Sequence, residues 1–283
     1  MKITVLGIPR ELLAMALNGT SGATFGVQLR VLTKRLMIRV IRRPYTELPT
    51  VLISAFFLFV YVGQLDKVFG GSAMPSSIDF SKGNFVNFIL PFSIVSASIS
   101  GASSGINLVE DIESGVFRRY QAMPISRWAV ILAPMLVGAL RVLLQSGLIL
   151  GLGILIGASP ATGSLGFVVI LGIAFLWGMG FAGYSVAAGI RSGSAQGAQA
   201  ATFLFFPALF IAPTFVPREA LSGWLSSAAA FNPTTYVIEA MRGIMIDGWI
   251  YESILKGVIA SGLFALITLS FAVISARKAT EKN

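Results

Sequence analysis

The residue types that usually perform chemistry are almost absent from the apolar part of this chain. The sequence of 283 residues holds no histidine and no cysteine. Its 12 aspartate and glutamate residues all lie outside six long apolar stretches or at their edges. General acid–base catalysis, a nucleophilic thiolate and thiolate–metal coordination therefore lack candidate groups. We expect no catalytic residue and no metal site.

One charged side chain nevertheless lies deep within an apolar stretch. Arg141 is about 13 residues into the stretch 128–156, and Gln145 follows one helical turn later on the same face. An arginine at the centre of a membrane is costly unless it faces protein or water. Two interpretations remain open. Arg141 attracts an anionic group on a transported molecule or a lipid, or it pairs with carbonyls or hydroxyls of a neighbouring helix.

The six apolar stretches predict an all-α, polytopic membrane protein. About 20 apolar residues at 1.5 Å rise cross a hydrocarbon core of roughly 30 Å. Hydrophobic residues make up 55% of the chain and charged residues 12%, which excludes an ordinary soluble domain. We predict six transmembrane helices at 48–65, 85–109, 128–156, 164–190, 197–216 and 255–276. The domains are then an N-terminal tail 1–24, a basic amphipathic helix 25–47, a transmembrane domain 48–276 and a C-terminal tail 277–283.

The distribution of basic residues predicts the orientation in the cytoplasmic membrane. With both termini in the cytoplasm, most of the 21 lysines and arginines fall on the cytoplasmic side, as the positive-inside rule requires. The net charge of +9 is therefore interpreted as loop bias, and nucleic acid is not an expected partner.

The segment 25–47 has the pattern of a helix that lies on the membrane surface. An apolar stripe recurs at helical spacing at Leu29, Leu32, Leu36 and Val40. Basic residues, among them Lys34, Arg35 and Arg39, fall on the other faces. A basic face opposite an apolar one is typical of interfacial helices. A simple charged anchor is the alternative.

Small residues are concentrated in the second apolar stretch and recur at four-residue spacing. The pairs are Gly101/Gly105, Gly147/Gly151 and Gly153/Gly157. Such spacing lets helix backbones approach closely within a membrane. Packing inside the chain, a subunit interface and a surface facing the transported molecule all remain open.

The cytoplasmic connection 110–127 carries acidic residues first and basic residues last. This order predicts a short amphipathic helix whose ends complement the helix dipole. A docking surface and an ordinary solvated turn are both consistent with it. The residues of interest are Asp111, Glu113, Gly115, Phe117, Arg118, Arg119, Pro124 and Arg127.

The outer connection 217–254 is longer than two adjoining helices require. Helical spacing on both sides of the turn signal Asn232-Pro233 predicts two short helices. They would form an interfacial or re-entrant hairpin, in which Glu239 and Arg242 are spaced to pair. The notable residues are Pro217, Trp224, Asn232, Pro233, Tyr236, Glu239 and Arg242.

Two of these segments resemble one family. The pattern D-x-E-x-G-x-F-R-R…M-P-I-S-R at 111–127 is similar to the loop between spans two and three of ABC-2 type transporter permeases. The pattern P-R-E…W…N-P-T-T-Y…E-A-M-R at 217–242 is similar to the family's signature before the last span. The lysine that often follows the P-x-S-R element is missing, which leaves the subfamily open.

The resemblance implies the permease subunit of an ATP-driven exporter for a hydrophobic drug-like, lipid or lipid-linked substrate. It implies that the loop 110–127 and the basic helix touch a separate pair of P-loop ATPase subunits, and that a second permease copy or a paralogue completes the membrane part. The sequence has no G-x-x-x-x-G-K-[ST] motif, so ATP and Mg²⁺ are expected on the partner. Membrane lipid is the other expected partner. The alternative is an ion-coupled carrier or channel, and the missing membrane-embedded acids argue against ion coupling.

Overall fold

In the computed structural model every regular element is helical in the described residues, which are 24–69, 85–98, 103–115, 125–203, 205–215 and 218–281. This agrees with the predicted all-α class. The helices are α2 (Phe25–Arg42), α3 (Leu48–Phe69), α4 (Phe85–Ser96), α5 (Ser103–Glu113), α7 (Arg127–Leu155), α8 (Ser164–Ser192), α9 (Ala195–Phe203), α10 (Phe206–Ile211), α11 (Gly223–Phe231), α12 (Pro233–Ile246) and α13 (Tyr251–Glu281), with short 3-10 turns at Pro44–Thr46 and Arg218–Ala220.

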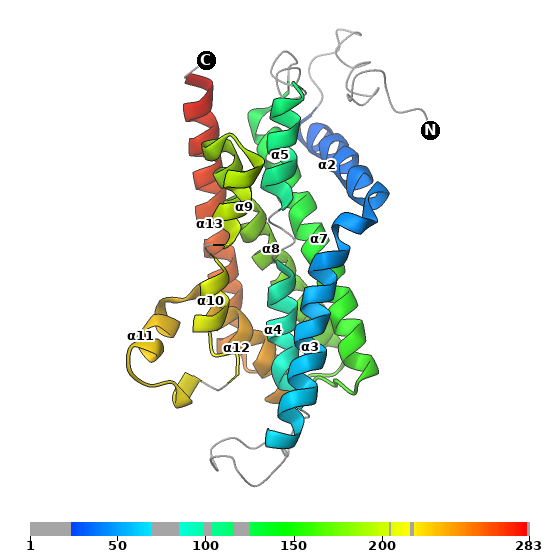
Figure 1. Ribbon diagram of the computed structural model, residues 1–283, viewed down its shortest axis with the longest axis vertical. Helices are drawn as coiled ribbons and strands as arrows, with labels where there is room; N and C mark the ends of the chain where they lie inside the picture. The colour runs from blue at the N-terminus through cyan, green and yellow to red at the C-terminus, as the bar shows by residue number, and fades with distance from the viewer. Residues whose placement is uncertain are drawn as a thin grey trace.

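The long helices form an elongated bundle (Figure 1). Helix α8 packs against α7 on one side and α13 on the other. Trp177 and Phe181 of α8 are fully buried in the main apolar core. At the lower end of Figure 1, α12 packs against α13 and α4. Large apolar side chains remain exposed along α3 and α13, as expected for helices that face lipid.

Among the described residues, three helices are long and apolar enough to span a membrane. They comprise Trp128–Leu155, Ser164–Ser192 and Tyr251–Ala276, and they coincide with the third, fourth and sixth predicted spans. Shorter apolar helical segments, Leu48–Gln64, Phe85–Ser96 and Ala195–Ile211, coincide with the other three. The complete six-span arrangement stays a prediction.

The predicted span 85–109 is divided into two helices. Helix α4 ends at Ser96 and α5 begins at Ser103, and the two lie end to end along the bundle (Figure 1). The Ser96 hydroxyl donates to the Ser93 carbonyl at 2.7 Å, and the Ser98 hydroxyl donates to the Val95 carbonyl. Such local hydrogen bonds compete with the helical ladder. These hydrogen bonds lie where α4 ends, at a point that hydropathy alone predicts to be inside one continuous helix.

The predicted span 197–216 is also divided. Helix α9 ends at Phe203, and α10 begins at Phe206 with Pro207 in its first turn. Proline lacks the N–H that an uninterrupted helix needs at this position. It is tolerated in the first turn of a new helix, where that N–H would have no helical partner.

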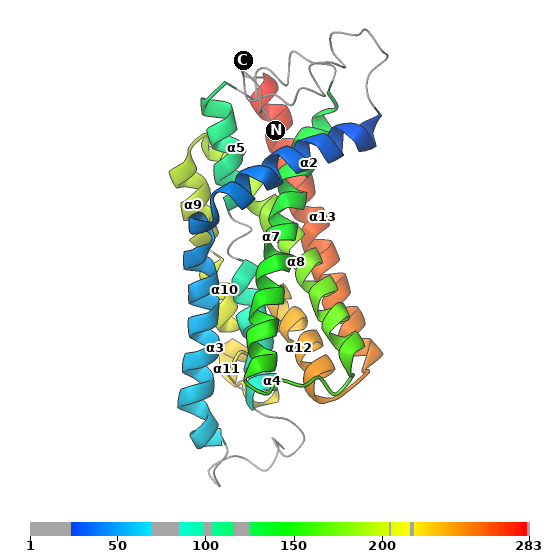
Figure 2. The same ribbon diagram turned by 90° about the vertical axis from the view of Figure 1, so that its right-hand side faces the viewer.

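Helix α2 crosses the bundle obliquely, whereas α3 runs along it (Figure 2). The chain turns between them through the 3-10 segment Pro44–Thr46. Val31 and Leu32 of α2 are buried against Ala129 and Ala133 of α7. Leu29 and Leu36 of the predicted stripe also pack against this cluster, so part of the predicted apolar stripe contacts the first turns of α7.

One small residue sets a close helix contact. A side chain at Gly105 of α5 would collide with the backbone of Ser185 on α8, and the Gly105 N–H donates to the Ser185 hydroxyl at 3.1 Å. Gly101 lies outside the described residues. No neighbour lies within 4 Å of the added carbon at Gly147 or Gly151. Gly153 of α7 is also close to a neighbour, since an added carbon there would lie 2.8 Å from Leu90 Cδ1 on α4. Of the predicted pairs, Gly105 and Gly153 thus serve packing inside the chain.

We expect Gly105→Ala to destabilise the protein by about 1–3 kcal/mol, because the added methyl group must push α5 away from α8. Thermal unfolding of the purified protein in detergent measures this. Gly147→Ala is the matched control, since its methyl group meets open space. Equal unfolding temperatures for the two variants would contradict the close contact.

Candidate coupling site and buried charges

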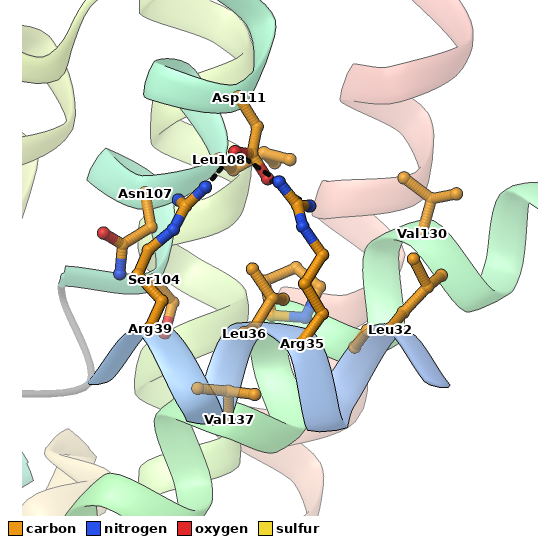
Figure 3. A pocket seen from close by; sticks show the side chains of 12 residues that line it. Leu32, Arg35, Leu36, Arg39, Ser104, Asn107, Leu108, Asp111, Val130 and Val137 are labelled. Carbon is orange, nitrogen blue, oxygen red and sulfur yellow. Dashed lines mark hydrogen bonds and ion pairs between the residues drawn. The ribbon is translucent and has the colours of Figure 1, made fainter. Parts of the chain in front are cut away.

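Two arginines of α2 hold one aspartate of α5. Arg35 Nη1 lies 3.1 Å from Asp111 Oδ2, and Arg39 Nη2 lies 2.6 Å from Asp111 Oδ1. Asp111 is only 5% exposed. A buried carboxylate is stable when charged donors compensate its lost hydration. The three side chains are shown in Figure 3, and the arginines are separated from Asp111 by more than 70 residues along the chain.

The acidic residues of the connection end a helix and do not begin one. Glu110 and Glu113 belong to the last turn of α5, and the chain leaves the helix at Gly115 with φ +72°. A glycine with positive φ is a common helix terminator. The prediction that the acids start a short helix is therefore wrong. At the C-terminal end the helix dipole disfavours a carboxylate, and the arginines of α2 offset this for Asp111.

Helix α2 also holds the other end of the connection. The backbone N–H of Ser126 donates to Gln28 Oε1 at 2.8 Å, and α7 begins at the next residue, Arg127. Gln28 is buried. Both ends of the segment 112–125 are therefore tied to α2, one through Asp111 and the other through Ser126.

The predicted coupling residues are only partly visible. Asp111 takes part in the charge cluster, Glu113 is exposed, and Gly115 forms the turn. Arg127 is the first residue of α7. The residues outside the described ranges are Phe117, Arg118, Arg119 and Pro124.

Basic residues of α2 also contact the protein, which the prediction did not include. Arg35 and Arg39 were expected on the faces away from the apolar stripe, but both point to Asp111. Their side chains are 16% and 28% exposed. Lys34, in contrast, is exposed. Spacing alone did not show this, because the compensating carboxylate belongs to a distant helix.

A small hollow lies beside the charge cluster (Figure 3). Its volume is about 30 Å³, enough for a few water molecules and far below a site for a drug-sized molecule. The hollow is not a candidate substrate pocket. The lining side chains come from α2, α5 and α7.

The intramembrane arginine has an acidic partner that the sequence analysis missed. Arg141 Nε donates to Glu47 Oε2 at 3.0 Å, and Arg141 Nη2 pairs with Glu47 Oε1. Gln145 Nε2 donates to Glu47 Oε2 at 3.1 Å. The Arg141 side chain is 4% exposed and that of Glu47 is 16% exposed. The structure thus supports pairing inside the chain, with a carboxylate in place of the expected carbonyls or hydroxyls.

A sequence signal for this pair exists. Glu47 is a lone acid immediately before an apolar stretch, and Arg141 is a lone base within another. Two isolated opposite charges at membrane depth are expected to find each other. The signal does not say which of the edge acids is the partner.

Arg242 of α12 joins three segments. Its Nη2 atom donates to the carbonyls of Pro213 and Thr214 at 2.9 and 3.1 Å, and its Nε atom donates to the Phe88 carbonyl at 3.4 Å. The guanidinium carbon lies 3.6 Å from the centre of the Phe88 ring. Arg242 therefore fixes α12 to α4 and to the segment before the hairpin.

The two helices predicted around Asn232-Pro233 are present as α11 and α12. Asn232 caps α12 by accepting from the Thr234 N–H at 3.0 Å, and its amide donates to the Ala208 carbonyl at 2.6 Å. The Tyr236 hydroxyl donates to the Ala230 carbonyl at 2.7 Å. These contacts fix the turn between the helices.

The other signature residues differ in their surroundings. Trp224 is 75% exposed, as expected for an interfacial aromatic. Glu239 is half-buried on α12, and Pro217 lies outside the described residues. The re-entrant position of the hairpin and the pairing of Glu239 with Arg242 stay predictions.

Residues 27–246 match the family described as ABC-2 type transporter. The match runs from the first turn of α2 to the end of α12 and includes the charge cluster, the Glu47–Arg141 pair and the helices α11 and α12. It therefore covers far more than half of the chain. The chain belongs to the ABC-2 type transporter family.

Curated relatives are named as permeases of this kind. The chain is 24% identical over 249 residues to the probable doxorubicin resistance ABC transporter permease protein DrrC of Mycobacterium tuberculosis, covering 87% of each chain. It is 25% identical to the daunorubicin resistance ABC transporter permease protein DrrB1 of Streptomyces coeruleorubidus, covering 71% of this chain and 69% of that one. It is 26% identical to the putative transport permease ycf38 of Cyanophora paradoxa, covering 80% and 77%.

In this ABC-2 family chain, removing one member of the Glu47–Arg141 pair should leave a buried charge without its partner. We expect Glu47→Gln and Arg141→Gln each to destabilise the protein by about 3–5 kcal/mol. The double charge exchange Glu47→Arg with Arg141→Glu should recover part of that loss, because the pair is restored in reverse. Thermal unfolding in detergent measures all three.

The exposed pair Lys256 and Glu252 supplies the control. Its atoms lie 2.7 Å apart and both side chains are more than half exposed, so Lys256→Gln should leave the unfolding temperature unchanged. A double exchange that is less stable than both single variants would contradict direct pairing of Glu47 with Arg141.

Proposed function

We propose that this chain is the permease subunit of an ATP-binding cassette exporter in the cytoplasmic membrane. It moves a hydrophobic drug-like, lipid or lipid-linked substrate, and its energy comes from a separate ATPase subunit. The family membership and the names of its relatives support the permease role. The class of transported molecule and the ATPase partner are what this proposal adds to the permease role.

The observation that carries the proposal is the attachment of both ends of one connection to α2. Asp111, before the connection, is bound by Arg35 and Arg39, and Ser126, after it, is bound by Gln28. A force on the segment 112–125 must then act on α2, α5 and the start of α7 together. Because α5 also packs against α8, such a displacement reaches the centre of the bundle. An ATPase docked on the connection needs this transmission of its movement to the membrane helices.

The nucleotide belongs to the partner in this proposal. ATP and Mg²⁺ bind to a pair of P-loop ATPase subunits, which close on the bound nucleotide and pull the docked connections with them. A second copy of this chain, or a paralogue, supplies the other half of the membrane domain. The permease part corresponds to residues 48–276, preceded by the basic helix 25–47 and flanked by the tails 1–24 and 277–283.

The end of the bundle that holds α2 is the cytoplasmic end in this proposal. Arg30 and Arg42 of α2, and Arg43 just after it, are exposed, and α8 ends nearby with Arg191 in its last turn. Helix α13 runs to the same end (Figures 1 and 2). This clustering favours cytoplasmic termini under the positive-inside rule.

The test is reconstitution with a separate P-loop ATPase subunit from the same organism. We expect the two to co-purify, and inverted vesicles that contain both to accumulate doxorubicin or daunorubicin only when ATP is supplied. Vesicles with an ATPase that binds but does not hydrolyse ATP are the control. Uphill accumulation by the permease alone would overturn the proposal.

The charge cluster gives a sharper prediction. Asp111→Asn should leave the ATPase bound but reduce ATP-driven transport by about tenfold, because a neutral amide no longer holds the two guanidinium groups and α2 is uncoupled from α5. Asp111→Glu keeps the charge and should retain most of the transport. The ratio of substrate moved to ATP hydrolysed measures the effect.

Glu252→Gln is the control for this experiment. Glu252 is an exposed acid in the first turn of α13, outside the connection, so the loss of its charge should not alter the contact between α2 and α5. Unchanged transport by Asp111→Asn would show that the cluster does not carry the coupling.

A further inference from the structure

We propose that the hollow between α2, α5 and α7 binds the phosphate group of an anionic phospholipid. This rests on the proposed function to the extent that α2 lies on the cytoplasmic membrane surface. Among the residues that line the hollow, Arg35 and Arg39 are cationic and Asp111 is anionic. The remaining lining residues are polar or apolar.

Two hydrogen-bond donors at this hollow have no acceptor among the described residues. Arg39 uses Nη2 to hold Asp111, while its buried Nη1 atom is without a partner. The hydroxyl of Ser104, which is 2% exposed, is also without a partner. Leaving a buried polar group unsatisfied costs free energy. Both groups belong to the lining of the same hollow, so one bound ligand can satisfy them together.

The two donors specify the chemistry of that ligand. A guanidinium N–H and a hydroxyl both donate, and a phosphate oxygen accepts from both, with the charge-assisted bond to arginine as the stronger one. Asn107 lies on the same side of the hollow, above Ser104 and beside Arg39 (Figure 3). Its amide offers a further donor. An anionic oxygen ligand therefore fits this corner of the hollow.

The walls favour a lipid over a free anion. Leu36 and Val137, with the other apolar lining residues, form most of the surface around the polar corner. A volume of about 30 Å³ has room for one or two phosphate oxygens, each about the size of a water molecule, so the glycerol and acyl chains must lie outside the hollow. Exposed Tyr45 and Trp128 lie just after α2 and in the first turn of α7, and such aromatics are typical of the headgroup level of a membrane. Basic pockets between helices on the cytoplasmic side are suited to anionic headgroups.

Occupation by lipid would join the two helices that the charge cluster holds. Arg39 is on α2 and Ser104 is on α5, so one phosphate group that accepts from both adds a bridge beside Asp111. The consequence is a dependence of coupling on membrane composition. Anionic lipid should strengthen the attachment of α2 to α5, and zwitterionic lipid should not.

The experiment measures lipid binding by the purified full chain, without the ATPase. Thermal unfolding is followed during titration with dioctanoyl phosphatidylglycerol, dioctanoyl phosphatidylcholine and inorganic phosphate. We expect phosphatidylglycerol to raise the unfolding temperature in a saturable manner. Ser104→Ala and Arg39→Lys should each weaken its binding by about tenfold, the effect of losing a charge-assisted hydrogen bond.

Ser104→Ala is informative because the Ser104 hydroxyl makes no hydrogen bond in the described structure. Its removal should leave the unliganded protein as stable as the wild type. Arg39→Lys retains the positive charge opposite Asp111. Ser146→Ala is the matched control, since Ser146 is a fully buried serine on α7 whose hydroxyl is also without a partner among the described residues but does not line the hollow. It should bind phosphatidylglycerol like the wild type.

Several results would overturn the proposal. An equal rise in unfolding temperature with phosphatidylglycerol and with phosphatidylcholine would show that the hollow does not recognise an anionic lipid. Wild-type affinity of Ser104→Ala for phosphatidylglycerol would show the same. Protection by inorganic phosphate at least as strong as that by phosphatidylglycerol would assign the site to a free anion. Since the ATPase is absent, failure of ATP-driven transport in the reconstitution above would refute the proposed function without altering the lipid result.

Discussion

A charged side chain inside an apolar helix bundle must have its charge compensated by the bundle itself. Three such groups in the described structure meet this requirement in different ways. Asp111 is held by two arginines, Arg141 by Glu47, and Arg242 by backbone carbonyls and an aromatic ring. In a membrane the apolar surface does not distinguish a neighbouring helix from lipid. The compensated charges, together with close contacts such as that of Gly105 with α8, therefore specify which helices lie together and in which register.

The segment from α2 to the start of α3 carries a large share of these compensating groups. Gln28, Arg35 and Arg39 contact the two ends of the connection 112–125, and Glu47 contacts α7 further along the bundle. Because α2 is oblique, one helix reaches both α5 and α7. A displacement at the end of the bundle that holds α2 is thereby shared among α2, α5 and α7. In the proposed exporter this geometry converts movement of an ATPase into movement of the membrane helices.

Hydropathy predicted the helices whose whole length is apolar. The predicted spans 128–156 and 164–190 agree closely with α7 (Arg127–Leu155) and α8 (Ser164–Ser192), since a long apolar run in lipid has no alternative to the helix. The breaks at Ser96 and before Pro207 were missed, because they depend on local serine and proline chemistry that barely changes the hydropathy. The acids of 110–113 were predicted to begin a helix, but they form the last turn of α5. The prediction missed that α5 continues through them until the turn at Gly115.

The sequence by itself determined the membrane class, the approximate helices, the clustering of basic residues and the two segments that resemble the permease family. These features follow from composition and short spacing, which are visible in one dimension. Only the tertiary structure decided that Arg35 and Arg39 turn inward to Asp111 and that Glu47 is the partner of Arg141. The pairing of charges 72 to 94 residues apart depends on the crossing of α2 over α7 and on the packing of α5 against α8. Helical periodicity describes each helix face separately and contains no information about which distant face it meets.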